Sequence, residues 1–330
     1  MFSPQFIEDL WYGRSFLSLL LLPLSWCYVA SISVRRLAYA SGILPVRQVA
    51  VPVIVVGNIT AGGTGKTPLT IWMADYLKQN KYHPGVISRG YGGGVKQWPQ
   101  QVRPDSNPAL VGDEPVLIAQ RTHVPVAISP NRYIAAKALV EHMHCDVLLC
   151  DDGLQHYALF RNIEIAIVDG DRRFGNGRSL PAGPLREPVG RLKTVDMVVS
   201  NGNMGRNQHL MEYVPLKLRS LRDEDKRCDL ESFAGKCVHA VAGIGNPNRF
   251  FSLLRSKQIN IIKHAFPDHY PYQAEDLLFG DDLPVVMTEK DAVKCRDFAD
   301  DDFWYLPIEV NVTNAFKHRL KNLLKETLDG

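Results

Sequence analysis

The sequence has no strong charge bias, no Cys-x-x-Cys pair, no internal repeat and no low-complexity tract. The net charge of +3 is small and the basic residues are spread along the chain, which argues against a nucleic-acid-binding protein. The six cysteines lack histidines at the spacing of a zinc site, so we expect reduced cysteines, no structural metal and a protein that faces the cytosol. No segment indicates an obligate protein partner. A composition of 45% hydrophobic and 22% charged residues is that of a globular protein, and 330 residues suffice for two domains.

Residues 16–34 carry no charge, and this run ends at Arg35 and Arg36. Its length is at the lower limit for a membrane span, and Pro23 and several serines interrupt it. We therefore expect a membrane-associated helix within residues 1–38, which either spans the bilayer or lies in its surface. The two arginines favour a cytoplasmic flank. A cleaved signal peptide and a buried core helix are the alternatives.

The stretch VPVIVVGNITAGGTGKTP, at 51–68, has the order strand, glycine-rich turn, helix. The apolar run 53–56 predicts a buried parallel strand, and Pro68 suits the first turn of a helix. Glycines without Cβ atoms let backbone N–H groups converge on phosphate oxygens at the helix N-terminus. We therefore predict a nucleotide-binding loop, which consists of Thr60, Ala61, Gly62, Gly63, Thr64, Gly65, Lys66 and Thr67.

Two side chains of this loop are expected to contact the ligand directly. Lys66 would reach the β- and γ-phosphates, and Thr67 would hold Mg²⁺. The general phosphate-loop pattern has glycine where this chain has Thr60. A glycine-rich turn with a surface lysine is the alternative. The helix after the loop is predicted to pack one apolar face onto the sheet. This face comprises Leu69, Trp72, Met73, Tyr76 and Leu77.

Apolar runs alternate with helical segments after the loop, and the runs lie at 85–87, 124–128, 147–150, 163–168 and 197–199. This alternation predicts an α/β fold with a doubly wound, mostly parallel sheet whose ligand lies at the carboxyl ends of the strands. A polar, charged region separates it from a second, smaller α/β unit. The expected segments are the N-terminal helix at 1–38, a P-loop domain at 39–205, a linker or hinge at 206–232 and the smaller domain at 233–330.

Two pairs of acidic residues are candidates for metal and proton chemistry. Asp151 and Asp152 follow the predicted strand 147–150, where carboxylates can hold Mg²⁺ directly or through water. A simple turn is the alternative. Asp113 and Glu114 open a predicted helix, where one carboxylate could accept the proton of an attacking hydroxyl and the other could help hold the metal. Acids are also favoured at a helix N-terminus whatever the function, so a capping turn is equally compatible with the pattern.

Two arginines and one histidine lie in loops rich in glycine and proline. Arg89 and Arg186 are candidates to bind phosphates or an anionic substrate, because guanidinium is a bidentate donor. Ordinary surface arginines are the alternative. His269, within FPDHYPY, is a loop histidine whose pattern alone assigns no role.

Seven motifs occur in one order over about 240 residues, namely VVGNITAGGTGKTP, SRGYGG, VGDEP, DDGLQH, PAGPLREP, FPDHY and MTEKDAVK. Together they closely resemble the tetraacyldisaccharide 4′-kinases of lipid A biosynthesis, whose phosphate loop shares the departure at Thr60. The resemblance implies transfer of the ATP γ-phosphoryl group to the 4′-hydroxyl of an acylated glucosamine disaccharide 1-phosphate, a lipid substrate. It also implies action at the cytoplasmic face of the inner membrane and two α/β domains joined by a hinge.

The resemblance also implies roles for residues already singled out. Asp113 would be the base, acting with His269, and Arg186 would face the transferred or substrate phosphate. The implied ligands of phosphate and magnesium are Lys66, Thr67, Glu114, Asp151 and Asp152. A substrate with four acyl chains stays in the bilayer, which would give the apolar N-terminal segment a function.

Two other functions are compatible with parts of the pattern. A membrane-associated P-loop ATPase or GTPase switch could act on a protein partner, but such switches often carry a second lysine where this loop has Ala61. A dinucleotide-binding oxidoreductase is suggested by GIGNPN, but the glycine spacing differs from that fingerprint.

Overall fold

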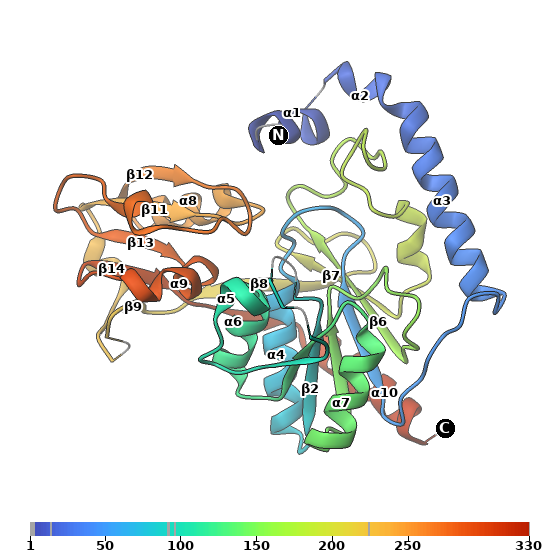
Figure 1. Cartoon of the computed structure of the whole chain (residues 1–330). Helices are drawn as coiled ribbons and strands as arrows, with labels where there is room; N and C mark the ends of the chain where they lie inside the picture. Colours follow the sequence, from blue (N-terminus) through green and yellow to red (C-terminus); the bar gives the residue numbers. More distant parts are fainter. Residues whose placement is uncertain (1–3, 14, 91–92, 96, 224, 330) are drawn as a thin grey trace.

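The computed structural model describes residues 4–13, 15–90, 93–95, 97–223 and 225–329 (Figure 1). Its strands form a nine-stranded sheet and a six-stranded sheet, which we call the large sheet and the small sheet. Helices pack on both, so the predicted α/β class is confirmed. Tyr91 and Gly92 of the predicted SRGYGG motif lie outside the described residues.

The large sheet is mostly parallel. Its strands are β1 (Val53–Gly57), β2 (Pro84–Ser88), β3 (Gln100–Val102), β4 (Val126–Ile128), β5 (Val147–Asp151), β6 (Ile163–Asp169), β7 (Met197–Asn201), β8 (His209–Pro215) and β15 (Ile308–Val312). Their order is β15-β8-β7-β6-β1-β5-β2-β4-β3, and the two edge strands, β15 and β3, pair antiparallel. All six predicted apolar runs are strands of this sheet, whereas the sequence did not indicate β3, β8 and β15.

Helices cover both faces of the large sheet because the apolar residues of β1 point alternately to each side. Ile54 and Val56 face the side that is covered by α4 (Lys66–Gln79), α6 (Asp113–Thr122) and α10 (Asn314–Asp329). Val53 and Val55 face the side that is covered by α7 (Arg132–Met143). A short helix, α5 (Pro108–Val111), precedes α6. This two-sided arrangement is the predicted doubly wound sheet.

One face of α4 packs differently from the prediction. Leu69, Met73 and Leu77 are fully buried against the large sheet, as expected. Trp72 and Tyr76 are instead half-buried and stack on each other with ring centroids 5.0 Å apart, and Trp72 also contacts Phe316 of α10. The face of α4 that packs on the sheet is therefore narrower than predicted. Its aromatic residues lie at the edge of that face, where Trp72 contacts α10, a helix from the far end of the chain.

The small sheet has the order β10-β9-β14-β13-β11-β12. Its strands are β9 (Leu218–Ser220), β10 (Arg227–Cys228), β11 (Cys237–Ala242), β12 (Asn260–Ala265), β13 (Val285–Thr288) and β14 (Phe303–Leu306). One face is covered by α8 (Pro247–Ser256) and the other by α9 (Glu289–Cys295). Short 3₁₀ turns occupy Val189–Lys193, Leu230–Phe233, Ala274–Leu277 and Arg296–Phe298.

The chain enters the small sheet after β8 and returns to the large sheet at Pro307. The return strand β15 pairs antiparallel with β8, with Ile308 opposite Pro215 and Val312 opposite Met211. The large-sheet part therefore contains segments that the prediction placed elsewhere. Strand β8 lies inside the predicted linker, and β15 and α10 lie inside the predicted smaller domain. Which sheet an edge strand joins depends on tertiary contacts, which the hydrophobic pattern of a short strand does not encode.

The uncharged N-terminal run is divided between two helices. The segment contains α1 (Pro4–Tyr12), α2 (Leu17–Leu20) and α3 (Leu22–Ala40). In the part of the chain that the structure describes, no helix has both the length and the apolar character needed to cross a bilayer, so the predicted spanning arrangement is not supported. The Ser25 hydroxyl fixes α3 to the large-sheet part, since it donates to Ser179 O at 2.8 Å and accepts from Ala182 N at 3.0 Å.

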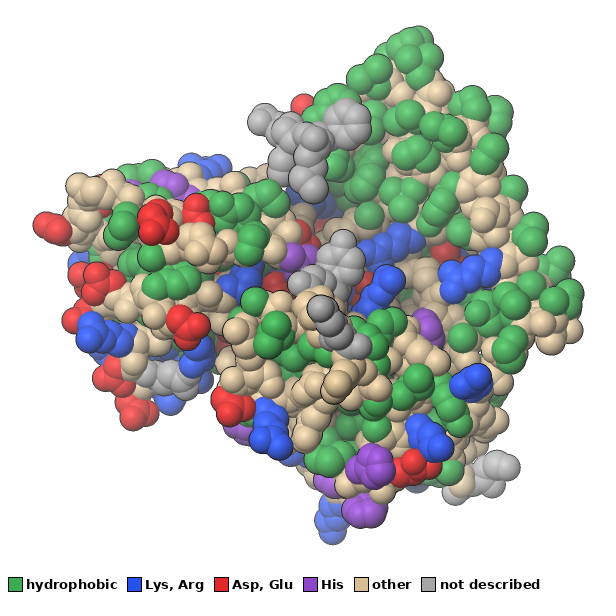
Figure 2. All heavy atoms as spheres, viewed as in Figure 1, with side chains coloured by type: hydrophobic (Ala, Val, Ile, Leu, Met, Phe, Trp, Pro, Cys, Tyr) green, Lys and Arg blue, Asp and Glu red, His purple; other side chains and the backbone are tan. Residues whose placement is uncertain are grey.

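The outer surface of α2 and α3 is apolar. Figure 2 shows hydrophobic side chains gathered over these helices, at the upper right of the molecule. The most exposed of these residues are Phe16, Leu20, Leu24, Trp26, Val34 and Leu37, each between 58% and 70% exposed.

Candidate active site

The loop between β1 and α4 has the predicted strand, turn and helix order. Gly62 and Gly65 have φ angles of 100° and 103°, in the region that favours glycine, and Gly65 directly precedes the first residue of α4. A Cβ atom at Gly65 would lie only 2.5 Å from Tyr213 Oη. Asn201 Nδ2 also donates to Thr64 O at 3.1 Å. The loop is therefore held in shape by β7 and β8, and a side chain at Gly65 is excluded.

A second loop supports the first. Arg186 N donates to Ile59 O, and Ala61 N donates to Pro184 O, both at 2.7 Å. The Tyr28 hydroxyl of α3 donates to Arg186 O at 2.9 Å. The Arg186 backbone is thus fixed between the phosphate loop and the N-terminal helix, which places its side chain beside the site.

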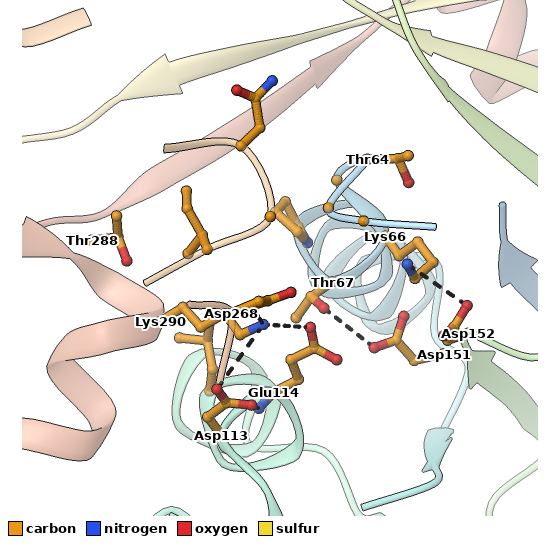
Figure 3. Close-up of a pocket in the computed structure, with 18 of the residues that line it drawn as sticks. Thr64, Lys66, Thr67, Asp113, Glu114, Asp151, Asp152, Asp268, Thr288 and Lys290 are labelled. Carbon is orange, nitrogen blue, oxygen red and sulfur yellow. Dashed lines mark hydrogen bonds and ion pairs between the residues drawn. The ribbon is translucent and has the colours of Figure 1, made fainter. Parts of the chain in front are cut away.

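Lys66 and Thr67 contact the acidic pair at the carboxyl end of β5, in which Asp151 is the last residue of the strand and Asp152 follows it (Figure 3). Lys66 Nζ lies 3.7 Å from Asp152 Oδ1, and Arg186 Nη1 lies 3.1 Å from Asp152 Oδ2. Asp151 instead accepts hydrogen bonds from two hydroxyl groups of α4, from Thr67 at 3.3 Å and from Thr70 at 3.1 Å. The structure therefore separates the two neighbouring aspartates by their partners.

The two aspartates also differ in acidity. Burial and the nearby Glu114 carboxylate raise the pKa of Asp151 to about 7. Burial acts in the same direction on Asp152, but the positive charges of Lys66 and Arg186 lower its pKa to about 2. Asp152 is thus already neutralised by two cations, whereas Asp151 is a buried carboxyl group whose ionised form needs further positive charge.

The oxygen atoms of Thr67 and Asp151 suit Mg²⁺, which typically binds one or two carboxylates together with nucleotide phosphates and water. Among the described residues, no three carboxylate, imidazole or thiol groups are close enough to enclose a metal ion by themselves. Glu114 Oε1 contacts Lys290 Nζ at 2.9 Å. Of the four predicted metal ligands, the structure therefore brings Thr67 and Asp151 together and pairs Asp152 and Glu114 with cationic side chains.

Asp113 and His269 form a pair that joins the two parts of the molecule. Asp113 is the buried first residue of α6, and His269 lies between β12 and β13 of the small sheet. His269 Nδ1 is 2.9 Å from Asp113 Oδ1 and 3.0 Å from Oδ2. Burial acts to raise the pKa of Asp113, but the hydrogen bond with His269 and the charge of Lys290 outweigh it and lower the pKa to about 2. The same hydrogen bond raises the pKa of His269 against burial, so the contact favours an ionised carboxylate with a protonated imidazole.

One cavity of about 2300 Å³ connects these groups. Every predicted site residue except Thr60 lines this cavity, and so does Arg89. Thr60 is buried in the floor of the loop. Parts of the chain more than 150 residues apart therefore face a common space.

Two cationic residues that lie beside the acidic groups of this cavity, Lys290 and Arg132, were not among the predicted site residues. Lys290, in the first turn of α9, contacts Glu114 and lies 3.0 Å from Asp268 Oδ1. Its available signal was its place in MTEKDAVK, one of the seven motifs, from which no role was assigned to Lys290. Arg132 is buried at the start of α7 and donates to Asp152 O at 3.1 Å. The sequence signal that could have identified Arg132 was an arginine at the start of a mostly apolar helix, RYIAAKALVEHM.

The segment 243–249 of the small-sheet part lies directly on the phosphate loop. A Cβ atom added to Gly245 would overlap the backbone N of Gly63. Arg172 donates to Gly245 O at 2.9 Å, and Arg249 pairs with Asp169 at 3.2 Å and with Asp171 at 2.9 Å. The two backbones thus approach each other as closely as glycines allow.

Replacing Gly245 with alanine is expected to weaken ATP binding without unfolding the protein. The added methyl group must push segment 243–249 away from the phosphate loop, and overpacking of this kind costs about 1–3 kcal/mol. We expect the KM for ATP to rise about tenfold, which corresponds to ~1.4 kcal/mol. The matched control is Gly190→Ala, because a Cβ atom at Gly190 meets nothing within 4 Å. Equal KM values for both variants would contradict the close approach.

Known proteins resemble this chain over most of its length. Residues 17–325 match the family described as tetraacyldisaccharide-1-P 4'-kinase. A tetraacyldisaccharide 4'-kinase of Nitrosococcus oceani is 51% identical over 96% of this chain and 93% of the relative. One of Hahella chejuensis is 44% identical over 97% and 96%, respectively. A crystal structure described as the "apo" form of LpxK from Aquifex aeolicus in complex with ATP is similar with a TM-score of 0.78 and 28% identity, covering 94% of this chain and 99% of that chain.

Proposed function

The chain belongs to the tetraacyldisaccharide-1-P 4'-kinase family, and from this we infer that it transfers the γ-phosphoryl group of ATP to the 4′-hydroxyl of a tetraacyldisaccharide 1-phosphate in lipid A biosynthesis. The observation that carries the mechanism is the placement of the phosphate loop and the Asp113–His269 pair on one cavity. Phosphoryl transfer requires alignment of donor and acceptor and neutralisation of charge, and little covalent chemistry from the protein.

Each side chain of the site has a part that its position supports. The loop N–H groups and Lys66 bind the β- and γ-phosphates, and Arg186 and Arg89 add positive charge near the transferred group. Asp113 accepts the proton of the 4′-hydroxyl. Its low pKa makes it a weak base, which suits a loose transition state in which the bond to the acceptor oxygen has barely formed.

Mg²⁺ fits the Thr67–Asp151 pair, because the buried Asp151 carboxylate gains the positive charge that its surroundings lack. Asp152 contributes through Lys66 and Arg186, which it orients. When bound, the ion would neutralise charge on the nucleotide phosphates. Glu114 can join the ion only after it leaves Lys290.

The function is tested by incubating the protein with γ-labelled ATP and tetraacyldisaccharide 1-phosphate in mixed micelles and measuring the label in the organic phase. We expect label in the lipid, at the 4′ position. Asp113→Asn in the same assay is the negative control, and Asp105→Asn, at an exposed turn, is the positive one. Label found only as free phosphate, released faster when a protein fraction is added, would instead support a P-loop switch.

The protein is proposed to act at the cytoplasmic face of the inner membrane, bound by the apolar surface of α2 and α3. Exposed leucine and tryptophan side chains followed by arginines are typical of helices that lie in the membrane interface. The Ser25 and Tyr28 contacts connect this surface to the loop that carries Arg186. A lipid that remains in the bilayer would thus meet the site at the membrane surface.

Changing two exposed leucines of this surface is expected to release the protein from membranes. In a Leu20→Ser, Leu24→Ser variant, we expect the partition coefficient onto vesicles of phosphatidylethanolamine and phosphatidylglycerol to fall at least about tenfold, since each buried CH₂ contributes about 0.8 kcal/mol. The matched control is Leu278→Ser, Leu328→Ser, which changes two leucines elsewhere that are at least half exposed. Sedimentation with vesicles measures both. Equal binding of the two variants would place the membrane contact elsewhere.

A further inference from the structure

Lys290 lies among acidic side chains from both parts of the molecule (Figure 3). Its Nζ atom is 2.9 Å from Glu114 Oε1 and 4.0 Å from Asp113 Oδ2, at the N-terminus of α6. The same atom is 3.0 Å from Asp268 Oδ1, in the loop that carries His269. One ammonium group therefore contacts Asp113 and the residue that directly precedes His269.

The position of Lys290 is set by rigid structure. The Thr288 hydroxyl caps α9 by accepting from Asp291 N, so the helix begins at a defined residue. The neighbouring Glu289 accepts two hydrogen bonds of 2.9 Å from Arg121, in the last turn of α6. Adjacent residues of α9 thus contact opposite ends of α6, which fixes the two helices side by side and directs Lys290 at the N-terminus of α6.

The charges make the lysine necessary at this point. Asp113, Glu114 and Asp268 each have a carboxylate oxygen within 4.0 Å of the same ammonium group, so their like charges would repel if that group were absent. Burial acts to lower the pKa of Lys290, but its three acidic neighbours raise the pKa well above the usual value, so the ammonium stays charged. An uncharged side chain here would leave like charges facing each other across the contact between the two parts.

Lys294, one turn further along α9, also lies near Asp113 but is used differently. Its Nζ atom is 3.9 Å from Asp113 Oδ2 and 3.0 Å from Asp291 Oδ1, and it lies over the Tyr272 ring at 4.8 Å. The shortest contacts of Lys294 are thus made within the small-sheet part. The shortest contact of Lys290, to Glu114 at 2.9 Å, crosses between the parts, whereas its contact to Asp268 at 3.0 Å stays within the small-sheet part.

We propose that Lys290 is a positioning residue for proton acceptance: it ties Asp113 and Glu114 to the Asp268–His269 segment and thereby holds the Asp113–His269 pair in its working geometry. This inference rests on the proposed kinase function. Lys290 acts through the pair, so its removal should slow the chemical step and leave nucleotide binding nearly unchanged.

Lys290→Met keeps most of the side-chain volume and removes the charge. A small displacement of a catalytic group costs about 100-fold in rate, so we expect kcat to fall about 100-fold while the KM for ATP changes less than about threefold. Lys290→Arg should recover part of the loss. Lys257→Met is the matched control, because Lys257 pairs with the exposed Glu231 within the small-sheet part, and it should leave kcat unchanged.

The decisive measurement combines Lys290→Met with His269→Ala. If Lys290 acts through the pair, adding Lys290→Met to His269→Ala should lower kcat by less than about threefold, because residues that act as a unit are not additive. A further loss of about 100-fold would overturn the inference. A rise in the KM for ATP with unchanged kcat would also overturn it, because Lys290 would then serve the nucleotide.

If Lys290→Met fails to fold in a thermal unfolding scan, Asp268→Asn removes one of the two short contacts at a less buried position. We then expect a kcat about tenfold lower that does not add to the effect of His269→Ala, and an Asp268→Asn variant with wild-type kcat overturns the inference. These outcomes are distinct from failure of the proposed function, in which the unmodified protein itself would not label the lipid.

Discussion

Replacing Lys66 with methionine is expected to lower kcat/KM for lipid phosphorylation about 10³-fold. Lys66 directly follows the glycine loop, and in the proposed function its ammonium is the cation that binds the transferred phosphate. Loss of one preorganised charge or donor that stabilises a transition state typically costs about 10²–10³ in rate. The expected loss corresponds to ~4 kcal/mol of transition-state stabilisation.

The fold should survive this change, because Arg186 still neutralises Asp152 at 3.1 Å when Lys66 is absent. The midpoint of thermal unfolding without nucleotide should therefore stay close to that of the unmodified protein, while the upward shift produced by ATP should shrink. Lys137→Met is the matched control, since Lys137 is an exposed lysine of α7 that pairs only loosely with Glu141 at 3.6 Å. Full activity of the Lys66 variant would refute the assignment of the phosphate site.

Replacing Asp113 with asparagine is expected to lower kcat by about 10²–10⁴, the range for loss of a general base. Asparagine keeps the size of the side chain but cannot accept the acceptor proton or pair with a protonated His269. The KM for ATP should change less than about threefold, because Asp113 contacts α9 and His269 and not the phosphate loop. Steady-state kinetics with both substrates varied measures this split.

Two comparisons make the Asp113 result specific. His269→Ala should have an effect of the same order, and the double variant should be no slower than the slower single one, because the two side chains act as a pair. Asp105→Asn, at an exposed turn, should have no effect. A rise in the KM for ATP with unchanged kcat would instead assign Asp113 to nucleotide binding.

The parts of the site that depend on local order were predictable from the sequence. The run from Val53 to Val56, the glycine turn and Pro68 lie within one short stretch, and the structure has β1, the loop and α4 where these signals place them. Thr288 likewise stands at the N-cap of α9, directly before the run EKDAVKC that forms this helix. Such features follow from backbone preferences of neighbouring residues.

Features that depend on distant partners were not predictable in this way. Asp151 and Asp152 are identical neighbours in the sequence, but burial beside Glu114 raises the pKa of Asp151, whereas Lys66 and Arg186 lower the pKa of Asp152. The role of His269 likewise depends on Asp113, more than 150 residues away. Proximity of this kind comes from the packing of the two sheets, which no local pattern reports.

The return of the chain to the large sheet has a consequence for synthesis. Strand β15 completes the edge beside β8, and Phe316 and Leu320 of α10 are fully buried under the same sheet as the nucleotide loop. A ribosome that has made only residues 1–307 therefore carries a nucleotide-binding sheet with one edge strand missing and part of its core open to water. We expect the edge and the core of this sheet to be completed only when residues 308–329 have left the exit tunnel and docked onto a sheet made some 100 residues earlier.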